Sequence, residues 1–118
     1  LEVAQRLVEL GVDEIAFGDT IGVASPREVR ALATMVAQEL PKSVAVAWHF
    51  HDTRGTALAN VFAALESTPD AGIDSSAGGL GGCPYAPGAS GNLATEDVIY
   101  AFQREGGLPH LDLGKVAR

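Results

Sequence analysis

The sequence predicts an α/β fold in which the strands of a parallel sheet alternate with helices. Short β-prone segments alternate along the chain with longer segments of helical periodicity, and the connections between them are short. Strands that are joined through helices in this way lie parallel, with right-handed crossovers. The chain has 118 residues, 47% of them hydrophobic and 19% charged, which is the composition of an ordinary globular domain.

The first part of the chain predicts a helix, a strand and a second helix. Apolar residues at helical spacing indicate a helix that ends near Leu10, because Gly11 stands where a left-handed C-cap belongs. A β-prone segment at 14–17 predicts the strand. The second helix begins after Ser25, which is followed by a proline and then by a glutamate in the spacing of a capping box, and Pro41 stops it.

The rest of the chain predicts two further strand–helix units. The continuous apolar run 44–48 indicates a strand covered on both faces, as in parallel sheets. Glycine and proline are too frequent in 78–91 for a regular element, so this segment is predicted to be a loop. The remaining predicted elements are a helix at 53–66, a strand at 73–76, a helix that begins at Thr95 and a tail helix from Leu108.

Two architectures share this order of elements. One is an open doubly wound sheet, and the other is an arc of a (β/α)8 barrel, which needs about 250 residues to close. Polar residues gather at the strand ends, and in a barrel these ends converge on one mouth, where active sites are built. The pattern therefore favours a site made from several strands. These polar residues are Asp19, Thr20, His49, His51, Asp52, Ser75 and Ser76.

Charge and cysteine content exclude several classes of function. The formal net charge is −7 and there is no basic run, which argues against nucleic acid and against an anionic membrane as partners. The longest apolar run is far shorter than the roughly 20 residues of a membrane-spanning helix. The single cysteine, Cys83, excludes an internal disulfide and favours a reducing compartment.

His49 and His51 are candidates for a metal site. One residue separates them, and alternate residues of a strand point to the same face about 6.6 Å apart along it, so both imidazoles can bind one cation. The competing interpretation is that one histidine only forms a hydrogen bond inside the fold. Their position at a strand end, followed by Asp52, favours the ligand interpretation.

Three other residues allow both a functional and a structural interpretation. Cys83 is either an exposed thiol that acts as an acid or base, or a small buried apolar residue. Asn92 either caps the next helix or offers a carbonyl oxygen to a metal. Glu96 is either a charge that favours the helix dipole or a catalytic base. His110, beside a proline in the tail, is predicted to lie on the surface.

Four motifs resemble hydroxymethylglutaryl-CoA lyase in their order and spacing, and they extend over nearly the whole chain. The motif with the cysteine is similar specifically to the lyases, whereas the His-x-His and the late Gly-Asn are shared across a wider superfamily of metal-dependent lyases and Claisen-type synthases. The motifs are Gly18-Asp19-Thr20-Ile21-Gly22, His49-Phe50-His51-Asp52-Thr53, Gly79-Leu80-Gly81-Gly82-Cys83-Pro84-Tyr85-Ala86 and Gly88-Ala89-Ser90-Gly91-Asn92-Leu93-Ala94-Thr95-Glu96-Asp97.

The resemblance implies a partial (β/α)8 TIM barrel. Residues 1–118 would be the C-terminal part of a single catalytic domain and would supply its last three strand–helix units. The resemblance also implies a divalent cation, Mg²⁺ or Mn²⁺, bound by His49, His51 and Asn92. A mixed set of nitrogen and oxygen ligands is compatible with these metals. No residue is assigned to CoA binding.

The resemblance further implies an acyl-CoA thioester as substrate. The reaction would cleave 3-hydroxy-3-methylglutaryl-CoA to acetyl-CoA and acetoacetate, a step of leucine catabolism. Its implied catalytic residues are Cys83, which protonates the thioester enolate, Asp19, which orients the substrate, and His49. Glu96 and Asp52 are implied as supporting residues.

One part of the family's site has no counterpart in these residues, namely an Arg-Asp pair that supplies an anionic metal ligand. We therefore expect the 118-residue chain by itself to bind a divalent cation weakly and to be inactive. We expect the full-length protein to be a homo-oligomer, cytoplasmic in a bacterium or mitochondrial in a eukaryote. Three alternatives stay open: a lyase for a bulkier 3-hydroxy-3-alkylglutaryl-CoA, a Claisen-type acyl-CoA synthase, and a non-catalytic fragment.

Overall fold

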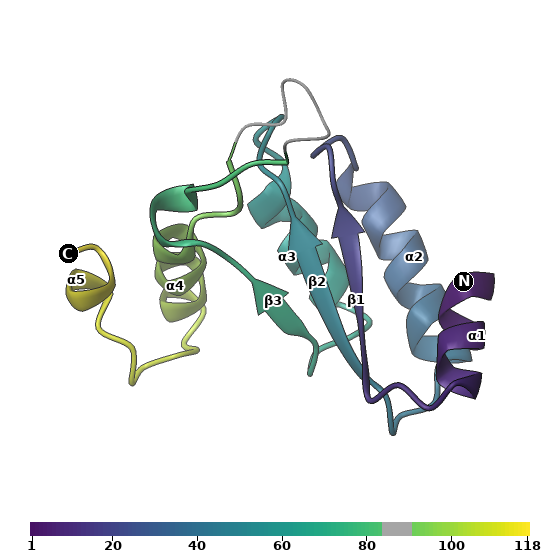
Figure 1. Ribbon diagram of the computed structural model, residues 1–118. Helices are drawn as coiled ribbons and strands as arrows, with labels where there is room; N and C mark the ends of the chain where they lie inside the picture. Colours follow the sequence, from purple (N-terminus) through teal and green to yellow (C-terminus); the bar gives the residue numbers. More distant parts are fainter. Residues whose placement is uncertain (84–90) are drawn as a thin grey trace.

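The structure is a computed structural model that describes residues 1–83 and 91–118. Its strands and helices alternate as predicted (Figure 1). Among the helices of these two segments, none combines the length and the hydropathy of a membrane span. In chain order the elements are α1 Glu2–Glu9, β1 Glu14–Asp19, α2 Pro26–Glu39, β2 Ala45–Phe50, α3 Ala57–Leu65, β3 Gly72–Asp74, the 3₁₀ helix η1 Ala77–Gly79, α4 Thr95–Arg104 and α5 Leu113–Val116.

The sheet confirms the predicted parallel α/β fold. β2 lies in the middle with β1 and β3 on either side, and both pairings are parallel. The register pairs Gly18 of β1 with His49 of β2, and it pairs His49 with Asp74 of β3. Because paired residues of neighbouring strands point to the same face, these three positions form one row near the carboxyl edge of the sheet.

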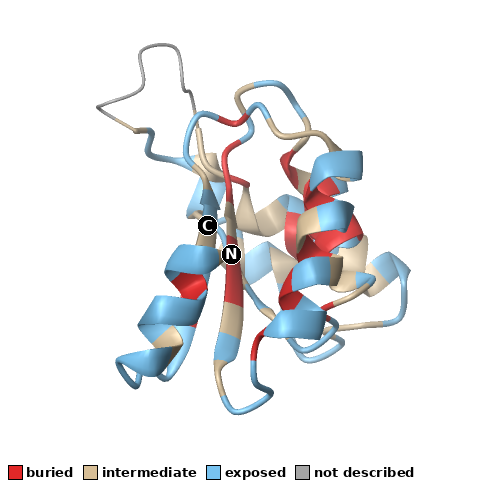
Figure 2. Ribbon diagram, turned by 90° about the vertical axis from the view of Figure 1, so that its right-hand side faces the viewer, coloured by how far each residue is buried: buried red, intermediate tan, exposed pale blue. Residues whose placement is uncertain are grey.

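The core lies between the sheet and the helices α2 and α3. Trp48 and Phe50 of β2 are 2% exposed and pack against the buried valines of the two helices. The indole of Trp48 also contacts the ring of Phe17, with centroids 5.1 Å apart, and its Nε1 donates a hydrogen bond to Thr68 Oγ1 at 3.0 Å. Figure 2 shows buried residues on the helices and on a strand between them, with exposed residues around the outside. One face of β2 is thus covered by α2 and α3.

The opposite face of β2 is less covered than predicted. The expectation that 44–48 is buried on both faces is wrong for the described residues, since Ala45 is exposed and only Ala47 and Trp48 within this run are buried. The reason is the alternation of a strand: every second residue points toward α2 and α3, and the others, including His49, point away from them. This second face carries the candidate site.

The boundaries of α3 and β3 differ from the prediction for reasons that the structure shows. α3 begins at Ala57 instead of residue 53, because Asp52 Oδ1 accepts a hydrogen bond from the Ala57 N–H at 2.9 Å and Gly55 has a φ of +70°, so the segment between them is a turn. β3 ends at Asp74, and Ser76 instead forms an isolated bridge to the segment before α4.

Two other local predictions are confirmed, and those for the tail and for the glycine-rich segment are confirmed in part. Ser25 Oγ accepts from the Glu28 N–H while the Glu28 carboxylate accepts from the Ser25 N–H at 2.9 Å, which is a complete capping box at α2. Gly11 follows α1 with a φ of +84°. The tail does form a helix, α5, which begins at Leu113 rather than at residue 108. The predicted loop 78–91 overlaps η1, and its part 84–90 lies outside the described residues.

Candidate metal centre

The candidate site lies at the carboxyl edge of the sheet, where the segment 91–93 returns beside the end of β2. Asn92 forms an antiparallel bridge with His51. Backbone hydrogen bonds flank this bridge on both sides, from Leu93 N to Phe50 O and from Asp52 N to the segment's first carbonyl, each at 3.2 Å. Residues opposite each other in an antiparallel pair have Cα atoms about 4.5–5.5 Å apart and side chains on one face. Asn92 is therefore next to His51.

His49 and His51 point to the same side, as their spacing predicted. Their ring centroids are 4.9 Å apart and their planes cross at 76°. His51 is 5% exposed, whereas 38% of the His49 side chain is exposed. Two imidazoles this close, one of them buried, can direct one nitrogen each toward a common cation.

The Nδ1 atom of each ring faces a protein oxygen. His51 Nδ1 lies 3.1 Å from the carbonyl oxygen of Asp19, and His49 Nδ1 lies 3.4 Å from Asp74 Oδ2. A carbonyl oxygen can only accept, so the neutral His51 ring must carry its proton on Nδ1, and Nε2 keeps its lone pair. Metal-binding histidines in proteins are oriented in the same manner, with the second nitrogen bonded to a carbonyl or carboxylate.

Asn92 is oriented in a comparable way. Its Nδ2 donates to the Leu80 carbonyl at 2.9 Å, which leaves its Oδ1 available to a cation. The alternative interpretation, that Asn92 caps the next helix, is wrong, because the N-cap of α4 is Ala94 and no side chain caps it. A Cβ at Gly81 would lie 2.8 Å from Asn92 Nδ2, so the glycine permits the amide to sit against the loop.

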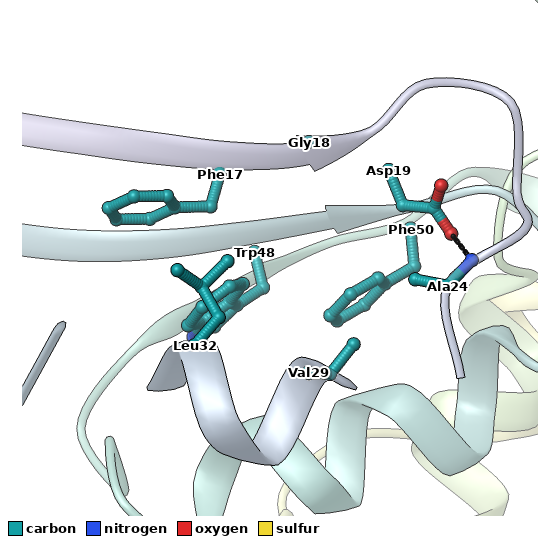
Figure 3. Close-up of a pocket in the computed structure, with 8 residues that line it drawn as sticks. All are labelled: Phe17, Gly18, Asp19, Ala24, Val29, Leu32, Trp48 and Phe50. Atoms are coloured by element: carbon teal, nitrogen blue, oxygen red, sulfur yellow. Dashed lines mark hydrogen bonds between the residues drawn. The ribbon is translucent and has the colours of Figure 1, made fainter. Parts of the chain in front are cut away.

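Asp19 contributes to the site through its backbone. Its carboxylate accepts from the N–H groups of Val23 and Ala24, at 3.2 and 2.9 Å, and thereby fixes the loop after β1. Figure 3 shows Asp19 at the end of an apolar pocket between β1, β2 and α2, bonded to Ala24. This pocket is on the face of the sheet opposite His49, so the carboxylate has a structural task in this geometry, while the carbonyl oxygen orients His51.

Asp52 and Glu96 also support the backbone. Asp52 Oδ1 accepts from the first N–H of α3, as described above. Glu96, in the first turn of α4, accepts from the Gly78 N–H at 2.8 Å through Oε2. Glu96 thus ties η1 to the start of α4, on either side of the glycine-rich loop.

Cys83 is a free thiol of intermediate exposure. It follows Gly81 by two residues, and Gly81 lies so close to Asn92 that a Cβ on it would be 2.8 Å from the amide nitrogen, so the thiol belongs to a loop that passes beside Asn92. The rest of its motif, Pro84 to Ala86, lies outside the described residues. The predicted surface position of His110 is confirmed, since that residue is exposed.

Asp74 is a site residue that the sequence patterns did not single out. The sequence predicts the third strand over 73–76, which places the two serines after Asp74 at the strand end. The structure ends the strand at Asp74 and places this carboxylate beside His49. A signal was present, since a lone acidic residue at the end of an apolar strand is typical of a site residue in parallel sheets.

The assembled donor set fits a divalent cation in part. The candidate donors are two imidazole nitrogens, from His49 and His51, and the amide oxygen of Asn92, which is paired with His51; the other polar atoms of His51 and Asn92 each face a backbone carbonyl. Within residues 1–83 and 91–118, no three His, Cys, Asp or Glu side chains form a group that could hold a metal. The described ligand set is therefore neutral, and a tight site for a hard cation needs an additional anionic ligand.

A parallel α/β sheet with polar side chains at its carboxyl edge defines a class of proteins that build their sites at strand ends. The model of the HMGL-like family matches residues 1–118, and the chain belongs to that family.

Curated proteins similar to this chain include hydroxymethylglutaryl-CoA lyases of bacteria and mammals. The protein of Pseudomonas mevalonii is 52% identical over 117 residues, which are 99% of this chain and 38% of that protein. The YngG protein of Bacillus subtilis is 48% identical over 88% of this chain and 34% of its own length. The mitochondrial lyase of Mus musculus is 54% identical over 84% of this chain and 30% of its own length. The chain thus spans about a third of the length of these relatives.

Solved structures give the same family. A Bacillus subtilis HMG-CoA lyase superposes with a TM-score of 0.85 and 45% identity over 98% of this chain and 38% of that chain. An Acinetobacter baumannii HMG-CoA lyase in complex with coenzyme A and 3-methylmalate superposes with a TM-score of 0.87 and 38% identity, over 98% of this chain and 37% of that chain. The carboxyl transferase domain of Rhizobium etli pyruvate carboxylase superposes with a TM-score of 0.77 but only 25% identity, over 98% of this chain and 18% of that chain. The identities favour the lyases over the carboxyl transferase.

Proposed function

We propose that this chain forms part of the active site of a metal-dependent carbon–carbon lyase that cleaves 3-hydroxy-3-methylglutaryl-CoA to acetyl-CoA and acetoacetate. The observation that carries the proposal is the convergence of His49, His51 and Asn92 beside the loop of Cys83. The three parallel strands are an arc of a (β/α)8 barrel, and the site lies at the barrel mouth.

The residues that would hold the metal are His49 and His51 through Nε2 and Asn92 through Oδ1. Mg²⁺ or Mn²⁺ suits such a set once an anionic oxygen ligand completes it, and that ligand would come from outside these 118 residues. When bound, the cation would lower the pKa of the substrate's tertiary hydroxyl and stabilise negative charge on its oxygen.

The bond changes balance without a redox partner. The tertiary hydroxyl gives its proton to a base and becomes the ketone of acetoacetate as the bond between C2 and C3 breaks. The electron pair of that bond passes into the thioester enolate, which needs one proton to become acetyl-CoA. Cys83 is the residue of this chain that would give that proton, because a thiol is a competent general acid and this one lies free in the loop that borders the ligands.

An acyl-CoA substrate is supported by the relatives. One of the similar HMG-CoA lyase structures is described as a complex with coenzyme A. The sequence of the cysteine loop and the identities of 48–54% to named lyases favour this substrate class over the carboxyl transfer of the more distant neighbour.

The test is a coupled assay of acetoacetate release by the full-length protein. We expect turnover of 3-hydroxy-3-methylglutaryl-CoA that chelation abolishes and that Mn²⁺ or Mg²⁺ restores. His51→Gln should remove activity and Mn²⁺ binding together, whereas His110→Gln, a change of the same kind on the surface, should alter neither. Full activity in the presence of a chelator, or in His51→Gln, would contradict the proposed site.

Substrate identity needs a second comparison. The turnover of the methyl substrate should exceed that of a 3-hydroxy-3-alkylglutaryl-CoA with a longer alkyl chain, and incubation with acetyl-CoA and a 2-keto acid should give no Claisen product. A preference for the longer chain would keep the lyase reaction but change its substrate. Claisen product instead of cleavage would replace the proposed reaction.

A further inference from the structure

The geometry points to a positioning task for Asp74: we propose that its carboxylate holds the ring of His49 with Nδ1 protonated and Nε2 directed at the cation. The inference rests on the proposed function only in that the cation is the one assigned above to His49, His51 and Asn92. Asp74 contacts no substrate in this scheme and acts through His49 alone.

The strand register fixes the two residues beside each other. His49 and Asp74 are direct partners in the parallel pairing of β2 with β3, so both side chains leave the sheet on the same face. Asp74 Oδ2 lies 3.4 Å from His49 Nδ1. The His49 ring also meets the His51 ring edge-on, with centroids 4.9 Å apart. The ring therefore lies next to both the carboxylate and the second candidate ligand.

The three candidate ligands share a common arrangement in which one polar atom is engaged by a protein oxygen. For His51 and Asn92 that oxygen is a backbone carbonyl, of Asp19 and of Leu80. For His49 the oxygen belongs to a charged side chain. A carboxylate behind a histidine fixes the tautomer and raises the basicity of the nitrogen that binds the metal.

The geometry also sets the size of the effect. The distance of 3.4 Å is longer than the 2.7–2.9 Å of a tight charge-assisted hydrogen bond, and both side chains are partly exposed, at 55% for Asp74 and 38% for His49. Loss of such an outer partner lowers metal affinity about 10- to 100-fold in general. We therefore expect Asp74→Ala to weaken Mn²⁺ binding by about 10-fold, at the lower end of this range.

The first measurement is the tautomer of His49 in the metal-free, full-length protein. Histidine labelled with ¹⁵N distinguishes a neutral ring protonated on Nδ1 from one protonated on Nε2. We expect His49 of the wild type to be protonated on Nδ1 and to lose this preference in Asp74→Ala. Asp74→Asn keeps an oxygen acceptor of the same shape, so it should retain most of the preference.

The second measurement is the dissociation constant for Mn²⁺, read from the electron paramagnetic resonance signal of the free ion. The matched control is Asp70→Asn, which removes the same charge from an exposed residue on the turn before β3, beyond the opposite end of that strand. We expect about 10-fold weaker binding for Asp74→Ala, an intermediate value for Asp74→Asn, and no change for the control.

The two measurements separate the possible failures. A His49 tautomer that is unchanged in Asp74→Ala overturns the proposal, even if Mn²⁺ binding weakens, because the carboxylate then acts only through its charge. Mn²⁺ binding that is as tight in Asp74→Ala as in the control overturns it as well. A wild-type protein that binds no Mn²⁺ refutes the metal site of the proposed function, and the tautomer result then decides the task of Asp74 by itself.

Discussion

Gly81→Ala is expected to disturb the candidate metal centre without a direct change to any candidate ligand. A Cβ on residue 81 would lie 2.8 Å from Asn92 Nδ2, where ordinary van der Waals contact begins at 3.4 Å. The amide must therefore move by about 0.6 Å, which exceeds the roughly 0.5 Å within which a functional site holds its geometry. Its hydrogen bond to the Leu80 carbonyl, now 2.9 Å, would lengthen at the same time.

The backbone adds a second contribution, which needs a control. Gly81 has a φ of +101°, and a side chain in such a conformation costs about 1–3 kcal/mol. Gly78→Ala is the matched variant, because Gly78 also has a positive φ, of +61°, but its Cβ would only meet the Leu80 side chain at 3.8 Å. Both variants introduce strain in the same loop, and only Gly81→Ala displaces Asn92.

The assay is Mn²⁺ binding to the full-length protein, with thermal unfolding measured in parallel. We expect Gly81→Ala to raise the Mn²⁺ dissociation constant about 10- to 100-fold, and Gly78→Ala to leave it within about 3-fold of the wild type. Equal Mn²⁺ affinities in the two variants would refute the reasoning that Gly81 is there for the Asn92 amide, because only strain would then distinguish them from the wild type.

Three further predictions follow from other contacts. Cys83→Ala should lower kcat about 10²- to 10⁴-fold in the acetoacetate assay while Mn²⁺ affinity stays unchanged, and wild-type kcat would exclude the thiol as the proton donor. Thr68→Val leaves the buried Trp48 Nε1–H without its acceptor, so urea unfolding should show a loss of about 1–3 kcal/mol, and an unchanged midpoint would contradict that contact. Hydrogen bonds from Arg30 hold the pKa of Glu66 below its ordinary value. The ion pair therefore stabilises the fold above about pH 4.5, and this stabilisation is lost as the pH falls through the lowered pKa. Between about pH 6 and about pH 3, the urea midpoint of Glu66→Gln should fall less than that of the wild type.

The local signals in the sequence were sufficient for the order and type of the elements. The capping box at Ser25, the glycine after α1 and the apolar stripes act within a few residues of each other, so they specify helix starts and stops without the rest of the chain. The motifs that resemble the lyases were also sufficient to identify the family, because each motif is a short continuous segment. The family model matches residues 1–118.

The parts of the prediction that failed depend on contacts that residue type does not reveal. The predicted start of α3 was too early because the carboxylate of Asp52, the fourth residue of the motif 49–53, accepts from the Ala57 N–H and holds the residues between them in a turn. The coverage of β2 was overestimated because an apolar run does not reveal whether a second layer lies on each face. Neither the capping contact nor the second layer can be read from the composition of the segment alone.

The sequence by itself determined the alternation of strands and helices, the shared direction of His49 and His51, and the resemblance to a family. Only the tertiary structure decided that Asn92 lies beside His51, that Asp74 and not a following serine lies beside His49, and that the Asp19 carboxylate faces away from the site. The physical reason is that side chains of a strand alternate between faces with a period of two. A one-residue difference in where a strand ends, or in how it pairs, therefore moves a residue from one face to the other.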